Sequence, residues 1–362
     1  MKYKKYGRTG KEISVVGFGG MRFPSIDKKY DYDLCGGMVK KAFELGINYF
    51  DTAPYYNDDQ SESIFGHAFK EMKGNYYVST KCASSDGSKV RESLENSLKR
   101  LNRDKIDFFH IWCVMNMEDF NNRTKKNGAY DACLKAKDEG LIDHICFSTH
   151  CNDDEIADIV SRGLFDGMTV GYNIINFKYR NKGIRAAYEN GLGVVTMNPL
   201  GGGLLPRNPE AFAYMVKDHT DIIEAAINFN ISHKEITCAL TGMDSMDHVM
   251  MNAGYADTPP SFSEAFLQEL LEKSTDQFNT LCTGCRYCEP CPQNIEVSKY
   301  MQNYNIMMLS SEQDMKSNLR VHWRIPAENL RDCIECRICE EKCTQHLPIT
   351  DRIKEMARIY GV

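Results

Sequence analysis

Residues 76–112 read YYVSTKCASSDGSKVRESLENSLKRLNRDKIDFFHIW and contain one complete strand–helix–strand pattern. The outer segments, Tyr76–Lys81 and Ile106–Trp112, are short apolar runs rich in β-branched and aromatic residues. Such runs are typical of parallel strands that are buried on both faces. Between them, Lys89–Leu101 carries apolar residues at the spacing of an amphipathic helix. The stretch therefore predicts a βαβ unit of a parallel sheet.

The same alternation continues on both sides of this unit, up to about residue 260. Six further strands are predicted at Val15–Gly19, Ile47–Thr52, His144–Thr149, Gly167–Tyr172, Gly193–Asn198 and Ile236–Thr241. Further helices are predicted at Leu34–Leu45, Tyr130–Glu139, Asp153–Arg162 and Ile222–Phe229. Eight strand–helix units in about 250 residues have the number and size of an α/β TIM barrel, (β/α)8. An open doubly wound sheet is the alternative, and the barrel is favoured because no GxGxxG follows the first strand.

The cysteines are unevenly distributed, and eight of the fifteen lie in two dense runs. Residues 282–292 read CTGCRYCEPCP and residues 333–344 read CIECRICEEKCT. Three thiolates at intervals of three residues, with a fourth further on, are typical of [4Fe–4S] binding in two-cluster ferredoxins. We therefore expect two [4Fe–4S] clusters, with the ligands Cys282, Cys285, Cys288, Cys291, Cys333, Cys336, Cys339 and Cys343.

Zinc and disulfide bonds are the alternatives for these cysteines. Zinc needs four ligands per site, commonly as separated CxxC pairs, which does not explain three consecutive steps of three. Disulfides are rare in cytosolic chains. The seven scattered cysteines, of which Cys35 is the first, are expected to be small buried hydrophobic residues.

These patterns predict three parts of the chain. Residues 1–257 form the barrel, residues 258–280 a connector that opens with Thr258-Pro259-Pro260, and residues 281–362 a small iron–sulfur domain. The gap between Cys291 and Cys333 is too long for a compact ferredoxin hairpin and contains the helical stretch Val297–Leu309. The tail therefore resembles an α-helical ferredoxin. By that analogy, the fourth cysteine of each run crosses to the other cluster.

Composition excludes several classes of partner. The formal net charge is −6 and no stripe of Lys and Arg stands out, so we expect neither a nucleic acid nor an anionic membrane as partner. No apolar run approaches the ~18 residues of a membrane span. Residues 1–15 lack the apolar region of a signal peptide, and we expect a cytoplasmic protein.

Three ionisable residues are expected at the C-terminal ends of barrel strands, where TIM barrels place catalytic groups. Asp51 ends the second strand, Lys81 ends the third, and Tyr56 follows Asp51 on its loop. A cation held by a carboxylate near a tyrosine lowers the pKa of the phenol and makes it a better general acid. An aspartate at a strand end is also compatible with a helix cap or a structural ion pair.

Several motifs together resemble the aldo-keto reductase family over residues 1–257. They are VGFGGM at 16–21, Asp51-Thr52-Ala53 with Tyr56, Glu62 with Gly66, Ser79-Thr80-Lys81, the helix around Ser93–Leu101, and Asn198-Pro199-Leu200. The cysteine tail is similar to a branch of that family that ends in a ferredoxin-like domain. The resemblance implies that Asp51, Tyr56 and Lys81 belong to the catalytic tetrad.

The fourth member of the tetrad departs from the family pattern. The family histidine is expected five residues after Asp107, where this chain has Trp112. His110 lies two residues earlier and faces the same side of the strand, about one pleat deeper. Both a catalytic His110 and a histidine that only lines the barrel fit this position.

The resemblance also implies a nicotinamide site. Its residues would be Ser148, Thr149, Thr169, Met197, Asn198, Leu200, Gly202, Met243, His248 and Asn252. Met197 replaces the aromatic residue that stacks on the nicotinamide, and His248 replaces the arginine that meets the 2′-phosphate. NADPH, NADH and the absence of a nicotinamide therefore all stay open.

Three functions are compatible with these features. The first is an oxidoreductase on a small carbonyl or alcohol, with Tyr56 as general acid and the clusters passing electrons to a redox partner protein. The second keeps Asp51, Tyr56 and Lys81 but lacks hydride transfer, as a lyase, isomerase or cluster-driven reductase. The third is a non-catalytic electron-transfer module, against which the retention of these three residues argues.

Overall fold

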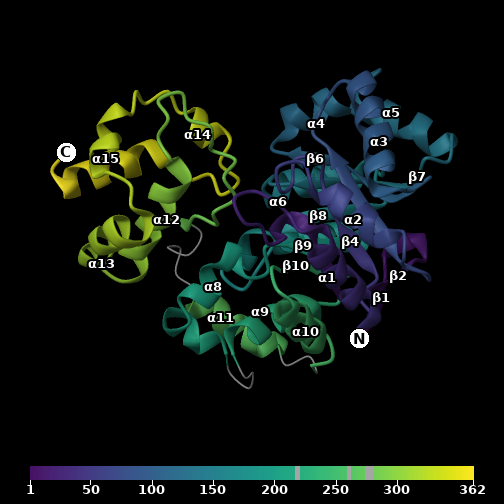
Figure 1. Ribbon diagram of the computed structural model, residues 1–362, viewed down its shortest axis with the longest axis horizontal. Coiled ribbons are helices and arrows are strands. Elements are labelled where there is room, and N and C mark those ends of the chain that lie inside the picture. The colour runs from purple at the N-terminus through teal and green to yellow at the C-terminus, as the bar shows by residue number, and fades with distance from the viewer. Residues whose placement is uncertain (217–220, 259–261, 274–279) are drawn as a thin grey trace. The chain divides into compact units, whose positions relative to one another are not determined.

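The computed structural model describes residues 1–216, 221–258, 262–273 and 280–362 (Figure 1). The chain divides into two compact units. The first consists of Met1–Leu200 and Met215–Phe266, and the second of Gly201–Tyr214 and Leu267–Val362. We keep the division into residues 1–257, 258–280 and 281–362 as a proposal. Pro259 and Pro260 of the predicted connector lie outside the described residues.

Eight parallel strands close into a barrel in the order β10-β3-β4-β5-β6-β7-β8-β9. They are β3 (Val16–Gly19), β4 (Tyr49–Asp51), β5 (Tyr77–Cys82), β6 (Ile106–Val114), β7 (Ile142–Thr149), β8 (Gly167–Gly171), β9 (Gly193–Met197) and β10 (Cys238–Gly242). Each overlaps one of the eight predicted strands. The (β/α)8 barrel is therefore confirmed, and the open doubly wound sheet is excluded.

Helices connect and cover the strands. They are α1 (Tyr32–Glu44), α2 (Ser61–Phe69), α3 (Gly87–Leu101), α4 (Met117–Thr124), α5 (Ala129–Asp138), α6 (Asp153–Ser161), α7 (Asn181–Glu189), α9 (Ile222–Ser232) and α10 (Met246–Tyr255). A further helix, α11 (Glu264–Lys273), contains the sequence boundary between the two units. In α3, the Asp86 carboxylate accepts N–H bonds from Ser88 and Lys89, and Asn102 ends the helix with a left-handed φ of 52°. These are the N-cap and C-cap chemistries that fix a helix between two strands.

A short antiparallel hairpin precedes the barrel and was not predicted. Its strands are β1 (Tyr3–Lys5) and β2 (Glu12–Ser14), paired from Tyr3 with Ser14 to Lys5 with Glu12. Tyr6, directly after β1, is fully buried and packs against Phe108 with ring centroids 4.2 Å apart. A Cβ at Gly167 or Gly193 would lie 2.0 or 2.2 Å from the Tyr6 side chain. The glycines at the starts of β8 and β9 thus make room for this ring.

The second unit is helical around its cysteine segments. Its elements are α8 (Leu204–Arg207), α12 (Val297–Leu309), α13 (Glu312–Asn318), the π-helix Leu319–Trp323, the 3-10 helix Ala327–Asp332, α14 (Ile338–Glu341) and α15 (Ile349–Tyr360). Tyr300, Met301, Met315, Ile353 and Met356 belong to one buried apolar cluster. The helix predicted at Val297–Leu309 coincides with α12.

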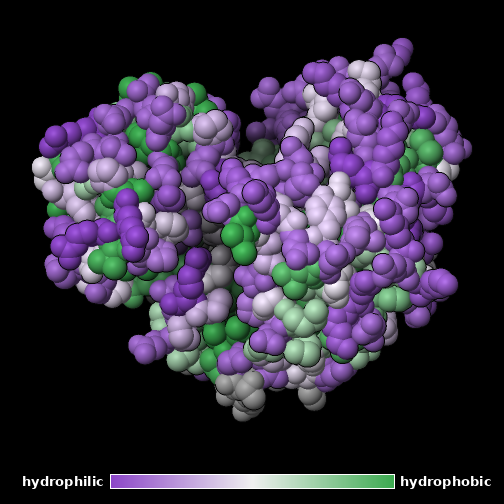
Figure 2. Space-filling model, in the orientation of Figure 1, coloured by the Kyte–Doolittle hydropathy of each residue, from purple (hydrophilic) through white to green (hydrophobic). Residues whose placement is uncertain are grey.

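The side chains that the molecule shows to solvent are mostly hydrophilic in the view of Figure 2. Among the described residues, no helix has both the length and the apolar character to cross a membrane.

Candidate functional site

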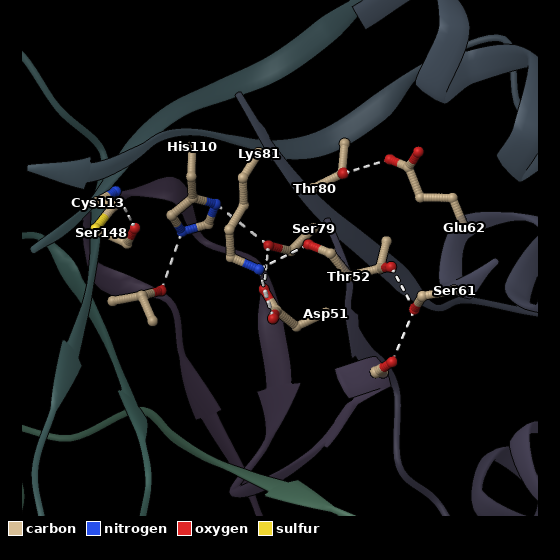
Figure 3. A network of polar contacts seen from close by, with 12 residues as sticks. Asp51, Thr52, Ser61, Glu62, Ser79, Thr80, Lys81, His110, Cys113 and Ser148 are labelled. Carbon is tan, nitrogen blue, oxygen red and sulfur yellow. Dashed lines mark hydrogen bonds and ion pairs between the residues drawn. The ribbon is translucent and has the colours of Figure 1, made fainter. Parts of the chain in front are cut away.

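A buried ion pair lies at the C-terminal ends of β4 and β5. Lys81 Nζ donates to Asp51 Oδ2 at 2.6 Å and to the carbonyl of Thr52 at 2.7 Å (Figure 3). Lys81 is 2% exposed and Asp51 4%. Burial lowers the pKa of Lys81, and the Asp51 carboxylate opposes that shift. The predicted lysine and aspartate therefore meet as a pair from which water is nearly excluded.

Tyr56 lies directly next to this pair. Lys81 Nζ is 5.0 Å from the centroid of the Tyr56 ring, so the cation faces the π-surface of the ring. Burial raises the pKa of Tyr56 well above its ordinary value, the charge of Asp51 adds to the increase, and Arg22 opposes it. The expectation that Lys81 lowers this pKa is wrong, because burial and the Asp51 carboxylate dominate. Tyr56 is thus held as a neutral phenol.

His110 lies inside the barrel and is completely buried. Its Nδ1 is 3.2 Å from Ser79 Oγ, and its Nε2 is 3.1 Å from Thr169 Oγ1. Because Ser79 donates its hydroxyl proton to Asp51 Oδ1 at 2.8 Å, Nδ1 must carry the proton toward Ser79 and Nε2 must accept from Thr169. Burial, and then the charge of Lys81, lower the pKa of His110 to about 3. His110 is therefore a neutral residue that connects to Asp51 through Ser79.

Trp112 lies next to Tyr56 at the end of β6. The pairing of β6 with β7 shifts between Ile111 and Val114, and Cys113 in this bulge has a φ of 63°. Trp112 contacts Tyr56 edge-on with ring centroids 5.6 Å apart and stacks on Tyr55 at 5.9 Å. Trp112 is 7% exposed, while Tyr56 is partly exposed. The tryptophan at the family's histidine position thus forms an aromatic wall beside the phenol.

The sequence analysis assigned no role in this site to two of its residues, Ser79 and Arg22. Ser79 joins Asp51 to His110, and Arg22 is the cation that opposes the raised pKa of Tyr56. Ser79 could have been found, because it lies two residues before Lys81 and side chains two apart on a strand face the same side. Arg22 lies in a 3-10 turn at Gly20–Arg22, and nothing in its local pattern indicates that it approaches Tyr56.

Three hydroxyl residues predicted for the nicotinamide site, Ser148, Thr149 and Thr169, have hydrogen-bond partners within the protein. Ser148 Oγ accepts from the backbone N–H of Cys113 at 2.8 Å. Thr149 Oγ1 donates to the carbonyl of Val114 at 3.0 Å, and Thr169 bonds His110. They lie at the ends of β7 and in β8, as expected, but all three also hold neighbouring strands in place.

The other residues predicted for the nucleotide are spread over three segments. Met197 ends β9, Asn198 follows it with a φ of 66°, and Leu200 comes two residues later. Met243, directly after β10, is fully buried. His248 and Asn252 lie on α10, where His248 Nδ1 is 2.6 Å from Asp244 Oδ1 and Asn252 is 4% exposed.

Gly202, which belongs to the second unit, has a close neighbour within that unit. A Cβ at Gly202 would lie 1.9 Å from the carbonyl oxygen of Thr283, the residue after Cys282. The backbone of this glycine, which was predicted for the nicotinamide site, therefore packs on the first cysteine segment.

Four cysteines from both runs line one small cavity in the second unit. They are Cys282, Cys285, Cys288 and Cys343, and the other lining residues include Met301, Leu347 and Ile349. The backbone N–H groups of Gly284 and Leu347 donate to the sulfurs of Cys282 and Cys343, each at 3.4 Å. No three His, Cys, Asp or Glu side chains in the described part of the chain converge at the spacing of ligands to a single metal ion. Four thiols around an apolar cavity, with N–H donors to two of them, fit a [4Fe–4S] cluster.

The two cysteine segments have the same backbone course. Left-handed residues follow Cys282 and Cys333 at equal offsets, namely Gly284 and Arg286 in the first segment and Glu335 and Arg337 in the second. Asn294 and His346, three residues after the fourth cysteines, are also left-handed. Helices α12 and α15 then begin at Val297 and Ile349. Cys291, Cys333 and Cys339 pack against the same apolar cluster, and Cys336 is exposed.

The scattered cysteines are buried as expected except for Cys113, which is partly exposed. None of the fifteen cysteines, all of which lie in the described part of the chain, forms a disulfide bond in this structure.

Comparison with known proteins identifies both parts of the chain. The model of the aldo/keto reductase family matches residues 15–274. The chain belongs to this family. The model of the 4Fe-4S dicluster domain matches residues 281–356. The protein is thus an aldo/keto reductase family oxidoreductase with a 4Fe-4S dicluster domain.

Curated relatives and solved structures agree with this assignment. L-galactose dehydrogenase of Arabidopsis thaliana is 28% identical over 287 residues, 70% of this chain and 87% of the relative. NADH-specific methylglyoxal reductase of Escherichia coli is 28% identical over 230 residues, 57% of this chain and 69% of the relative. The holo form of aldo-keto reductase AKR11C1 from Bacillus halodurans superimposes with a TM-score of 0.67 at 21% identity, covering 76% of this chain and 97% of that one. This last likeness concerns the fold alone.

Proposed function

We propose that the barrel interconverts a small carbonyl compound and its alcohol, with a nicotinamide as hydride carrier. In the reducing direction, NADPH or NADH supplies a hydride to the carbonyl carbon, and Tyr56 donates a proton to the carbonyl oxygen. The observation that carries this proposal is the Lys81–Asp51 pair, buried at a strand end with its cation over the Tyr56 ring.

The roles of the three residues follow from their charges. Tyr56 is a protonated phenol at neutral pH and can donate its proton, but the raised pKa makes it a weaker acid, so proton transfer depends on the neighbouring cation. Lys81 stabilises the negative charge that develops on the phenol oxygen as the proton leaves. Asp51 favours the charged form of Lys81 despite its burial. His110 does not need to touch the substrate in this scheme, because it positions Asp51 through Ser79.

The aromatic wall favours a small or flat substrate. Trp112 stacks on Tyr55 and contacts the Tyr56 ring edge-on, so aromatic rings border the phenol on one side. The names of the relatives point to compounds of this size, since one is a dehydrogenase of L-galactose and another a reductase of methylglyoxal.

The tail is proposed to hold two [4Fe–4S] clusters with crossed fourth ligands. Cys282, Cys285, Cys288 and Cys343 would bind one cluster, and Cys333, Cys336, Cys339 and Cys291 the other. When bound, each cluster transfers one electron, so two together match the two electrons of one hydride. A redox partner protein would exchange these electrons, and a reducing cytoplasm would keep the cysteines available as ligands.

A second candidate keeps the acid and base groups but lacks the nicotinamide. The observations that favour it are the protein partners of Ser148, Thr149 and Thr169 and the packing of Gly202 on Thr283. It would be a lyase, an isomerase or a cluster-driven reductase. Titration of the intrinsic fluorescence with NADPH and NADH separates the two candidates, because only the first predicts saturable quenching.

The test of the main proposal is Tyr56→Phe, which deletes one hydroxyl. We expect kcat for NAD(P)H-dependent reduction of small carbonyls to fall ~10²–10⁴-fold with unchanged nucleotide binding. Tyr55→Phe is the matched control, because Tyr55 is adjacent, exposed and not over Lys81. If both variants keep at least a tenth of the wild-type kcat, Tyr56 is not the acid.

A further inference from the structure

The carbonyl of Gly20 accepts two hydrogen bonds from the loop that carries Tyr56. Gly20 begins the 3-10 turn Gly20–Arg22, directly after β3. The side-chain amide of Asn57 donates to this carbonyl at 2.5 Å, and Ser61 Oγ donates to it at 2.8 Å. Asn57 directly follows Tyr56, and Ser61 begins α2. The segment between them is therefore attached to the end of β3 at both of its ends.

Position 20 must be a glycine for this contact to form. A Cβ at Gly20 would lie 2.6 Å from Ser61 Oγ and 2.3 Å from Cε2 of Phe65. Both residues lie on α2 and are fully buried, so neither can move away without disturbing the core. The absence of a side chain thus allows α2 to pack closely enough on the turn for Ser61 to reach the carbonyl.

The hydrogen bonds continue from Ser61 to Lys81. Thr52 Oγ1 lies 2.7 Å from Ser61 Oγ. Because Ser61 donates its one hydroxyl proton to Gly20, Thr52 must donate to Ser61. The carbonyl of Thr52 accepts from Lys81 Nζ at 2.7 Å, and Figure 3 shows the path from Lys81 to Ser61. A continuous path therefore connects the buried cation to Asn57, the residue next to the phenol.

The backbone after Tyr56 is strained. Asn57, Asp58 and Asp59 have φ values of 53°, 51° and 67°. This left-handed region is unfavourable for residues with a side chain, although Asn and Asp tolerate it best. The backbone N–H of Ser61 donates to the carbonyl of Tyr56 at 3.2 Å and closes the turn. Three consecutive residues keep such a conformation only where their surroundings hold them, so the bond from Asn57 constrains the course of the chain at Tyr56.

We propose that Asn57 is a positioning residue for Tyr56, and this inference rests on the proposed function of Tyr56 as the general acid. Asn57 attaches the loop to Gly20 and so keeps the Tyr56 ring beside Lys81, whose Nζ lies 5.0 Å from the ring centroid. Proton transfer depends steeply on geometry, and a displacement of ~1 Å can lower the rate ~10²-fold. Asn57 itself needs no contact with the substrate.

The experiment measures kcat and KM of the full-length protein for NAD(P)H-dependent reduction of a panel of small aldehydes and ketones that includes methylglyoxal. Asn57→Gly removes the amide donor but still permits a positive φ, so it separates the hydrogen bond from the backbone strain. We expect kcat to fall ~10–10²-fold with KM unchanged. Asp59→Gly is the matched control, because Asp59 is also left-handed and its side chain is exposed.

A double variant shows whether Asn57 acts through Tyr56. In the Tyr56→Phe background, Asn57→Gly should lower kcat no further, because the proton donor is already absent. A merely structural role would lower kcat by the same factor in both backgrounds, and that result would overturn the proposal.

The remaining outcomes separate this inference from the function beneath it. If Asn57→Gly has the kcat of Asp59→Gly, the role of Asn57 is refuted. If circular dichroism shows that Asn57→Gly does not fold, Ser61→Ala decides, because it removes the other donor to the Gly20 carbonyl. A wild-type kcat in Ser61→Ala then overturns the proposal. Wild-type protein that reduces no member of the panel, or Tyr56→Phe with the wild-type kcat, refutes the proposed function itself.

Discussion

The ion pair between Asp51 and Lys81 is the most consequential contact of the barrel at the scale of single residues. Its atoms lie 2.6 Å apart, and the side chains are 5% and 2% exposed. A buried charge that loses its partner keeps its desolvation cost and loses the attraction that offsets it. The pair therefore ties the stability of the barrel to two of the groups that we propose for its chemistry.

Asp51→Asn should lower the free energy of unfolding of the barrel by ~3–5 kcal/mol, because Lys81 remains buried without its anion. Glu71→Gln is the matched control. Glu71 lies 2.6 Å from Lys40 Nζ, the same distance, but these side chains are 64% and 36% exposed. Removing an exposed partner should lower the free energy of unfolding by only ~0–1 kcal/mol. Urea unfolding measures both, and equal losses would show that burial of the Asp51 pair carries no energetic weight.

His110 should make the barrel sensitive to acid. Its pKa is lowered from 6.5 to about 3, so between these values the unfolded chain binds a proton that the folded barrel does not. The free energy of unfolding should therefore decrease as the pH falls from 6.5 toward 3, by up to ~1.4 kcal/mol per pH unit from this group. In His110→Gln, the slope of the free energy of unfolding against pH should be smaller by the contribution of about one proton.

The control for His110→Gln is His248→Gln, because the His248 side chain is 49% exposed. Urea unfolding at a series of pH values gives the slopes. Identical slopes for wild type and His110→Gln would mean that His110 is protonated in the folded barrel.

The chemistry of this site could be predicted from the sequence only in part. Asp51 and Lys81 were found because strand ends meet at one rim of a barrel. The hydrogen-bond partners of His110 could not be predicted from the sequence, since Ser79 and Thr169 lie on two other strands. The prediction that the pKa of Tyr56 is lowered was wrong, because the burial of Tyr56 depends on tertiary packing, which the local sequence does not show.

At the scale of elements, the apolar parallel strands were predicted well, whereas short and irregular elements were not. A strand buried on both faces needs a continuous apolar run, and that signal is strong. The hairpin Tyr3–Lys5 and Glu12–Ser14 has only three residues per strand and carries lysines, so its signal is weak. The bulge at Cys113, next to Trp112, cannot be recognised from the pattern of apolar residues.

Gly202→Ala tests how the turn after β9 meets the first cysteine segment. The new Cβ would lie 1.9 Å from the Thr283 carbonyl, so the loop or the cysteine segment must move. We expect the variant to lose iron during purification. Gly203→Ala is the control, since Gly203 also has a positive φ but its Cβ would meet no atom closer than 3.5 Å. Iron contents that are equal in the two variants would contradict a structural role for this packing.

At the scale of the whole molecule, two compact units carry two kinds of chemistry. The barrel holds the phenol and its buried ion pair, and the helical unit gathers cysteines that are far apart in the sequence. The spacing of the cysteines alone led to the prediction of eight cluster ligands. That Cys343 lies together with Cys282, Cys285 and Cys288 was expected only by analogy with α-helical ferredoxins. The helices between the two cysteine runs determine how the runs come together, and the spacing of the cysteines does not show this.

The central claim is an aldo/keto reductase barrel joined to a tail with two [4Fe–4S] clusters. The most direct test is iron and acid-labile sulfide analysis of anaerobically purified full-length protein, combined with EPR of the reduced form. We predict about eight iron and eight sulfide per chain, with EPR signals from two clusters. About four iron per chain after careful reconstitution, or stoichiometric zinc in place of iron, would contradict it.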